Sequence, residues 1–301
     1  MSGHRSVAAR DGAAVREPRE ELPATPLYGC PLLERIASSA WSSIPASDVA
    51  VVVAHSDDEI IGCGAQLARL KGCSVILVTD GAPRGLRYAD RRGFRRRKAH
   101  AQAREQETRA ALELAGVPQC NLVMMNIPDQ EAAYRLPEIT LSLVREFATR
   151  GTRHVLTHSY EGGHPDHDAV AFSVHAAGAL SASRGSRIDI IEMPFYRMGR
   201  TGRLFQSFTE DEGYGHLGFR LTGHWLALKR KMMQCYPTQY PTIAMFSAGL
   251  EKFRLAPLHD FAKLPNAGKL FYETRPWGMT GARWLNLADR AINDLVGQAA
   301  A

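Results

Sequence analysis

Residues 48–59 read DVAVVVAHSDDE, an apolar run that ends abruptly in one histidine, one serine and three acids. Within residues 48–54 apolar and polar positions do not alternate, which predicts a strand buried on both faces. Ile61, Leu67 and Leu70 follow at roughly helical spacing, and residues 74–80 (SVILVTD) form a second apolar run. A strand, a helix and a strand in this order predict a βαβ unit at the centre of the protein.

The same alternation continues along the chain. The further predicted elements are a helix at 98–115, a strand at 121–126, a helix at 137–149, a strand at 154–157, a helix at 167–179 and a strand at 188–193. Strands that alternate with helices favour a parallel sheet. The predicted fold class is therefore α/β, with a Rossmann-like, mostly parallel sheet and helices on both faces. A last helix at about 281–296 has an apolar stripe, which indicates core or an oligomer contact.

The ends of the chain and its cysteines bear on domain organisation and location. Residues 1–26 have no hydrophobic period, which predicts a flexible leader, and residues 27–301 then form a single domain. No run approaches the roughly eighteen apolar residues of a membrane helix, and the N-terminus lacks a signal peptide's apolar core. Five cysteines without CxxC spacing indicate free thiols in a reducing compartment. We therefore expect a cytoplasmic protein.

The net charge of +6 is concentrated in one segment. Nine lysines and arginines fall within residues 84–104, where Asp90 is the only acid. The core of this segment, RRGFRRRK at 91–98, is interpreted as a solvated loop and helix start, or as a contact for a substrate that bears phosphate. With one aromatic and no recognised nucleic-acid module, it does not indicate nucleic-acid binding. A non-catalytic binder of nucleic acid or lipid surfaces is the hypothesis from a different functional class.

Two dense polar clusters follow predicted strands, at residues 55–59 (HSDDE) and 164–168 (HPDHD). Ligands of parallel α/β sheets bind at these carboxyl ends of the strands. Three adjacent acids are electrostatically costly there unless a cation compensates them. Two imidazoles and one carboxylate suit Zn²⁺ and leave a position open for water. A single histidine or aspartate at a strand end is more commonly a cap, but two clusters together favour a metal site.

These residues also carry a family resemblance. Residues 54–59 (AHSDDE) resemble the AHPDDE motif, and residues 163–167 (GHPDH) the HPDH motif, of the zinc-dependent PIG-L/LmbE deacetylases of GlcNAc-type amino sugars. Residues 104–116 and 229–239 resemble two further motifs of that family, so the resemblance covers about residues 48–239. Ser56 stands where the family has proline, and Tyr236 where its late motif has histidine.

The resemblance implies a role for each matching residue. It implies that His55, Asp58 and His167 bind zinc, although the same ligands accept Fe²⁺ or Co²⁺. Asp57 would be the base that takes a proton from the attacking water.

Two residues of the second cluster would assist them. A cationic His164 would stabilise the charge that develops on the acetamide oxygen, and Asp166 would orient or charge an imidazole.

The substrate side leaves alternatives open. By the family pattern Arg104 would hold a substrate hydroxyl or carbonyl, but it could equally pair with Glu105 or Glu107 on its own helix. His158 either lines the substrate wall or is a hydrogen-bonded core residue. Cys63 lacks a His/Asp partner set, which favours a buried thiol over a nucleophile. Aromatic residues from about 195 onward contribute a variable C-terminal substrate-side region or pack in the core.

The function that we expect is a zinc-dependent hydrolase that removes the acetyl group from an N-acetylated amino sugar. The sugar would belong to a small molecule, a glycoconjugate or its precursor. The alternative that keeps the metal is an amidase acting on another N-acyl amino sugar or on a thiol conjugate of an amino sugar.

Overall fold

A computed structural model describes residues 19–21, 29–38, 41–85, 93–209 and 215–300 of the chain. Residues 1–18 and 22–26 of the predicted leader lie outside the described residues, while Arg19–Glu21 form the edge strand β1. In the described residues, no helix combines the length and the apolar composition needed to cross a membrane.

An eight-stranded sheet forms the centre of the described structure, in the order β1-β11-β12-β8-β7-β3-β5-β6. Its parallel strands are β3 (Val49–Val53), β5 (Ser74–Thr79), β6 (Leu122–Ile127), β7 (His154–His158) and β8 (Asp189–Met193). Beyond β8 the sheet continues antiparallel through β12 (Leu250–Leu255), β11 (Leu217–Arg220) and β1. The prediction of an α/β fold with a mostly parallel sheet is confirmed.

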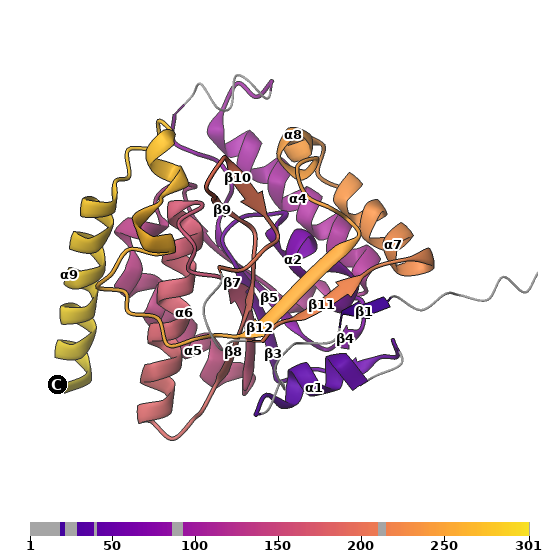
Figure 1. Cartoon of the computed structure of the whole chain (residues 1–301), viewed down its shortest axis with the longest axis horizontal. Coiled ribbons are helices and arrows are strands. Elements are labelled where there is room, and N and C mark those ends of the chain that lie inside the picture. The colour runs from indigo at the N-terminus through magenta and orange to yellow at the C-terminus, as the bar shows by residue number, and fades with distance from the viewer. Residues whose placement is uncertain (1–18, 22–28, 39–40, 86–92, 210–214, 301) are drawn as a thin grey trace, which may run out of the picture.

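Helices cover both faces of this sheet (Figure 1). One layer consists of α1 (Pro31–Ser38), α2 (Asp58–Leu67), α4 (Arg97–Ala115) and α7 (Gly223–Gln234), and the other of α5 (Leu136–Arg150), α6 (Pro165–Ser183) and α9 (Gly281–Ala300). Successive β3 side chains alternate between the two layers, with Val51 in one apolar cluster and Val52 in the other. Both faces of β3 are thus buried, which explains why its sequence is continuously apolar.

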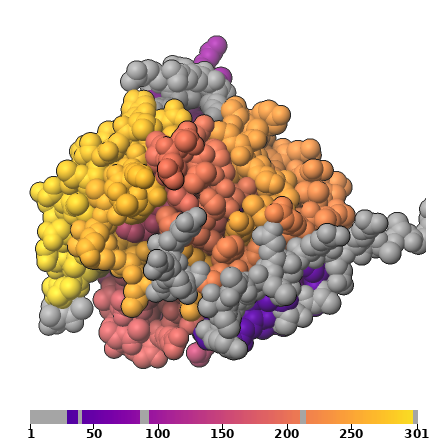
Figure 2. Space-filling model, viewed as in Figure 1, coloured from indigo at the N-terminus to yellow at the C-terminus, as the bar shows by residue number. Residues whose placement is uncertain are grey.

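The remaining described strands and the remaining α-helix are short. They are β2 (Ile44–Pro45), β4 (Leu70–Lys71), the hairpin β9 (Tyr196–Met198) and β10 (Arg203–Phe205), and α8 (Tyr240–Ile243). In the space-filling view the last helix, α9, forms one outer edge of the molecule (Figure 2). Trp284, Ala288 and Leu295 of its apolar stripe are buried in the core, whereas Ile292 is 38% exposed. The stripe is therefore mainly a core contact.

The first helix of the βαβ unit is shifted from its predicted position. The sequence predicted residues 61–70, but α2 spans Asp58–Leu67, and Leu70 pairs with Ile44 in a short parallel ladder. The helix begins early because Asp57 adopts a positive φ of 117°, which turns the chain directly from the strand end into the helix. Apolar periodicity cannot detect this turn, because the first helical positions are acids.

A kink in α2 is stabilised by residues from distant elements. Cys63 has non-helical angles (φ −145°, ψ 27°), which interrupts the backbone hydrogen bonds of the helix. Lys229 Nζ donates to Ile61 O at 2.9 Å, and Glu251 Oε1 accepts from Ala65 N at 2.8 Å. Lys229 and Glu251 also pair with each other at 2.9 Å and are buried. This buried ion pair therefore replaces the backbone partners that the kink removes.

Candidate active site

The two polar clusters meet at the carboxyl ends of neighbouring parallel strands. Residues 55–59 follow β3, residues 164–168 lie at the start of α6 beyond β7, and β3 pairs directly with β7. His55 and His167 come within contact distance although they are 112 residues apart. The structure thus brings the two predicted clusters into one site.

Three side chains of this site form a compact triangle. His55 Nδ1 lies 3.2 Å from Asp58 Oδ2 and 3.2 Å from His167 Nε2, and these last two atoms are 3.4 Å apart. A tetrahedral ion with bonds of about 2.0–2.1 Å separates its ligand atoms by about 3.3 Å. All three residues are buried, and their spacing fits a Zn²⁺-sized ion. They form a candidate metal centre.

A strained turn positions Asp58 in this triangle. The positive φ of Asp57 is rarely adopted by residues other than glycine, and such strain is concentrated at functional sites. The backbone N–H of His55 donates to Asp58 Oδ2 at 2.8 Å, and that of Asp57 donates to Glu59 Oε2 at 3.0 Å. The acids therefore fold back onto the turn that carries them, which fixes their oxygens.

Further carboxylates surround the imidazole of His55. Its Nε2 lies 3.3 Å from Asp166 Oδ2 and 3.4 Å from Asp129 Oδ1. Burial alone would lower the pKa of His55, but Asp129, Asp166 and Asp58 outweigh it and raise that pKa well above its usual range. The crowding of acids thus favours positive charge here, which a divalent cation in the triangle would supply.

Asp166 links the metal centre to the loop that follows β6. Besides contacting His55, its carboxylate accepts hydrogen bonds from the backbone N–H groups of Gln130 at 2.6 Å and Ala132 at 3.1 Å. This loop carries Asp129, which the sequence analysis did not assign. The signal that could have found it is the polar sequence NIPDQ (126–130) directly after a predicted strand.

Asp57 and Arg104 form a second pair beside the triangle. Arg104 Nη2 lies 3.5 Å from Asp57 Oδ1 and also donates to the carbonyl of Ser56. Burial raises the pKa of Asp57 well above its usual range, and Asp58 adds to this while Arg104 opposes it. The alternative partners for Arg104 are engaged elsewhere, since Glu105 pairs with Arg109 and Glu107 accepts from Thr238.

His164 lies at the N-cap of α6. Its Nδ1 accepts a hydrogen bond from the backbone N–H of Asp166 at 3.1 Å, so the ring proton belongs on Nε2. Burial lowers the pKa of His164 well below its usual range, and the charge of His55 lowers it further. These contacts favour the neutral imidazole over the cationic form that we expected, and the role of His164 at the acetamide oxygen stays a prediction.

His158 lies behind the metal centre, and not on the cavity wall. It is fully buried, its Nε2 accepts from the backbone N–H of Ala54 at 2.8 Å, and its ring stacks on His167 with centroids 3.9 Å apart. Of the two interpretations of His158, the structure agrees with the hydrogen-bonded core residue. The ring of His158 thus packs directly against the imidazole of His167.

A cavity of about 210 Å³ opens above these residues. Its polar lining includes the triangle, Asp57, Arg104, Asp129 and His164, together with His100, Gln130, Gln239 and Thr242. Tyr196, Phe246 and Trp277 line it with aromatic surface, and the Trp277 ring lies 4.4 Å from that of His164. The C-terminal region after residue 195 therefore contributes to the wall of this cavity.

Glu59 and Tyr236 are paired below the site. Tyr236 OH donates to Glu59 Oε1, and both side chains are buried. Burial raises the pKa of Glu59 to about 7, and the Tyr236 hydrogen bond opposes this shift. The tyrosine that stands in place of the family's histidine thus anchors the motif carrying Asp57 and Asp58.

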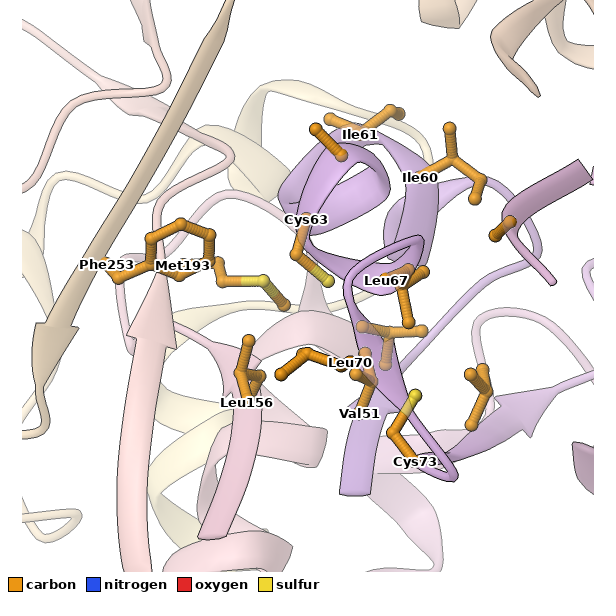
Figure 3. Close-up of a cluster of buried hydrophobic side chains, with 14 of the residues drawn as sticks. Val51, Ile60, Ile61, Cys63, Leu67, Leu70, Cys73, Leu156, Met193 and Phe253 are labelled. Atoms are coloured by element: carbon orange, nitrogen blue, oxygen red, sulfur yellow. The ribbon is translucent and has the colours of Figure 1, made fainter. Parts of the chain in front are cut away.

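Two other features of the sequence lie apart from the metal triangle. Cys63 is fully buried among apolar side chains (Figure 3), and its thiol donates to the carbonyl of Glu59 at 3.4 Å. In the basic stretch, Arg91 and Arg92 lie outside the described residues, Arg95 and Arg96 are exposed, and Arg97 is paired with Asp80.

Comparisons with known proteins agree with this architecture. A deacetylase of the A40926 pseudoaglycone, Dbv21, superposes with a TM-score of 0.52 at 18% identity, covering 69% of this chain and 96% of its own. A teicoplanin-bound deacetylase of the teicoplanin biosynthesis pathway gives 0.52 at 15% identity, covering 69% and 96%. N,N'-diacetylchitobiose deacetylase from Pyrococcus horikoshii gives 0.50 at 20% identity, covering 70% and 84%. At these identities the similarity concerns the fold.

No curated protein sequence matches the chain. Residues 50–178, however, match the family model described as PIG-L, GlcNAc-PI de-N-acetylase. These residues include β3, α2, β7 and the first turns of α6, and hence His55, Asp57, Asp58, His164 and His167. The motifs, the order of the strands and the matched residues lead to the same assignment, and the chain contains a PIG-L family domain over residues 50–178.

Proposed function

We propose that this protein is a divalent-metal-dependent hydrolase, with zinc as the expected ion, that removes the acetyl group from an N-acetylated amino sugar. The observation that carries the proposal is the triangle of His55, Asp58 and His167 with a separate carboxylate, Asp57, beside it in the same cavity. When bound, a divalent ion in this triangle polarises a carbonyl group and lowers the pKa of water. The family match and the deacetylases among the structural neighbours support the reaction class.

The protein groups around the triangle have complementary tasks. Asp57 is the general base that accepts a proton from the attacking water, because it lies beside the triangle without belonging to it. The Nε2–H of His164 donates to the acetamide oxygen as negative charge develops there. Arg104 holds the Asp57 carboxylate in place through its contact with Oδ1. Asp57 then returns its proton to the leaving amine.

The shape of the cavity supports an acetyl group on a sugar. At about 210 Å³ it lies below the usual range of about 300–1,000 Å³ for small-molecule sites, which favours a short acyl group. The aromatic faces of Tyr196 and Trp277 suit stacking on a sugar ring. The rest of a glycoconjugate would remain outside. Two of the structural neighbours are a teicoplanin-bound deacetylase and a diacetylchitobiose deacetylase, which makes glycoconjugates and short amino-sugar oligomers the first substrates to test.

An acetate-release assay tests this function. The full chain is stripped of metal, reloaded with Zn²⁺, Co²⁺ or Fe²⁺ from substoichiometric amounts upward, and offered N-acetylated sugars and their longer-acyl analogues. The metal is added in graded amounts because excess zinc can inhibit, as in the zinc-inhibited form of the teicoplanin deacetylase Orf2, another structural neighbour. We expect metal-dependent acetate release and slower release of longer acyl groups. Preference for the longer chains would favour the alternative N-acyl amidase.

Asp57→Asn provides the sharper test, because the amide keeps the shape of the side chain but cannot accept a proton. We expect a folded, metal-loaded protein with kcat lowered roughly a hundredfold or more. Asp289→Asn, at an exposed position on α9, is the matched control and should retain full activity. If Asp57→Asn loses its bound metal, Asp57 is a ligand, and if it keeps both its metal and its kcat, the assigned base is wrong.

A further inference from the structure

A second cluster of metal-binding side chains lies away from the candidate active site. His175 is on α6, eight residues beyond His167, which corresponds to about 12 Å along the helix axis. Glu192 is on β8, and His259 follows β12. Three elements that are distant in sequence thus converge on one point, and the proposed deacetylation uses none of the three residues.

The geometry of the cluster leaves one nitrogen without a partner. The ligand atoms of His175, Glu192 and His259 all lie within 4.8 Å of one another. The centroids of the two imidazole rings are 5.1 Å apart, and the ring planes are inclined at 66°. His259 Nε2 contacts Glu192 Oε1. His175 Nε2 is buried and has no hydrogen-bond partner in the described part of the chain. A buried polar nitrogen of this kind requires a partner, which a water or an ion supplies.

The carboxylate of Glu192 is held from its other side. Arg254 Nε donates to Oε2 at 2.8 Å and Ser159 Oγ donates to the same oxygen at 3.1 Å. These contacts fix the orientation of the carboxylate and leave Oε1 directed to His259. Outer partners of this kind typically orient metal-ligating carboxylates. The positive charge of Arg254 opposes a cation, so binding here should be weaker than at the triangle.

The cluster lies beside an open cavity. His175 and His259 line a cavity of about 690 Å³ between α6, α9 and the segment 258–262, and Asp260 lines the same cavity. The remainder of the wall is mainly apolar, with Phe172, Phe261 and Leu295 among its residues. This cavity lies next to the cluster and is separate from the cavity of the candidate active site.

We propose that His175, Glu192 and His259 form a second binding site for a divalent transition metal of the Zn²⁺ or Co²⁺ type. Two imidazoles and one carboxylate are the ligand set that such ions prefer. On binding, His259 Nε2 gives up its hydrogen to solvent or to Nδ1, and the contact with Glu192 is replaced by two bonds to the ion. The ligand atoms, which lie within 4.8 Å of one another, must also close to a spacing of about 3.3 Å, so the proposal requires the side chains to move together on binding.

Metal stoichiometry of the full chain tests the proposal. Metal-free protein is dialysed against graded Co²⁺ or Zn²⁺, the bound metal is counted by elemental analysis, and Co²⁺ binding is also followed by its visible absorption. We expect two equivalents for the wild type, with the second binding more weakly. His175→Ala and His259→Ala should each lose that weaker equivalent and retain acetate release. His224→Ala, an exposed histidine on α7, is the matched control and should keep both equivalents.

The outcomes separate this site from the candidate active site. His55→Ala should lose the tighter equivalent and keep the weaker one, whether or not the protein proves to be a deacetylase. His175→Phe, which suits the apolar cavity, replaces His175→Ala if the alanine variant fails to fold. If the His175 and His259 variants bind as much metal as the wild type, or if the wild type binds a single equivalent that His55→Ala removes, the partner of His175 is water and the proposal is wrong.

Discussion

Gly81 provides a direct test of whether the position of Arg104 matters for the reaction. It lies in the turn after β5 with a φ of +64°, and a Cβ atom added there would lie 2.9 Å from Arg104 Cζ and 3.0 Å from its Nε. Ordinary contacts begin at 3.4 Å, so Gly81→Ala must displace the guanidinium by about 0.5 Å. That movement alters both the contact with Asp57 Oδ1 and the hydrogen bond to Ser56.

The expected effect of Gly81→Ala has two parts, a loss of stability and a loss of activity. Placing alanine at a positive φ costs about 1–2 kcal/mol of stability, and each kcal/mol lowers the Tm by about 2–4 °C in a domain of this size class. Because displacing a catalytic group by 1 Å can cost about a hundredfold, a shift of half that size should lower kcat/KM roughly tenfold. The bound metal should be unchanged, because Arg104 does not contact the ligand atoms of the triangle.

Gly151→Ala is the matched control. Gly151 has nearly the same φ, +62°, but a Cβ added there meets no atom within 4 Å among the described residues. Both variants should therefore lose similar stability in thermal unfolding, while only Gly81→Ala should lose acetate release. Adding Arg104→Lys to Gly81→Ala removes the clash, so the two effects should not be additive. Equal kcat/KM for Gly81→Ala and Gly151→Ala would refute the reasoning.

Three further sets of variants test other parts of the structure. His55→Ala, Asp58→Ala and His167→Ala should each lose the tightly bound metal, measured by elemental analysis, and full occupancy in all three would exclude the triangle as the metal centre. Tyr236→Phe should cost about 1–3 kcal/mol in denaturant unfolding, because buried Glu59 loses its hydrogen bond, whereas Tyr240→Phe at a 71% exposed position should cost almost nothing. Burial raises the pKa of Glu161 to about 8. In the folded protein its carboxyl group therefore keeps a proton that the unfolded chain releases above about pH 4.5. The contribution of Glu161 to the free energy of unfolding of the wild type should fall as the pH rises from about 4.5 to about 8. Glu161→Gln keeps an acceptor for the N–H groups of Phe195 and Tyr196 but cannot titrate. The free energy of unfolding of this variant relative to that of the wild type should therefore rise across that pH range. Parallel curves of unfolding free energy against pH for the two proteins would contradict this.

The sequence alone predicted the parallel strands and the position of the site because both depend on local pattern. β3 and β5 are continuously apolar since both of their faces are covered, and this burial is visible residue by residue. The clusters at 55–59 and 164–168 follow strands whose carboxyl ends share one edge of a parallel sheet. The two clusters could therefore be placed together before any distance was known, whereas the three proposed metal ligands within them were named from the family resemblance.

Only the tertiary structure decided the contacts that depend on packing between distant segments. Asp129, Tyr196 and Trp277 reach the cavity from loops and a hairpin whose sequences have no period that predicts their direction. The antiparallel strands β11 and β12 were not predicted either, and with them came the buried Lys229–Glu251 pair at the kink of α2. Periodicity reports whether a side chain is buried, whereas the identity of its partner is set by how complete elements pack against one another.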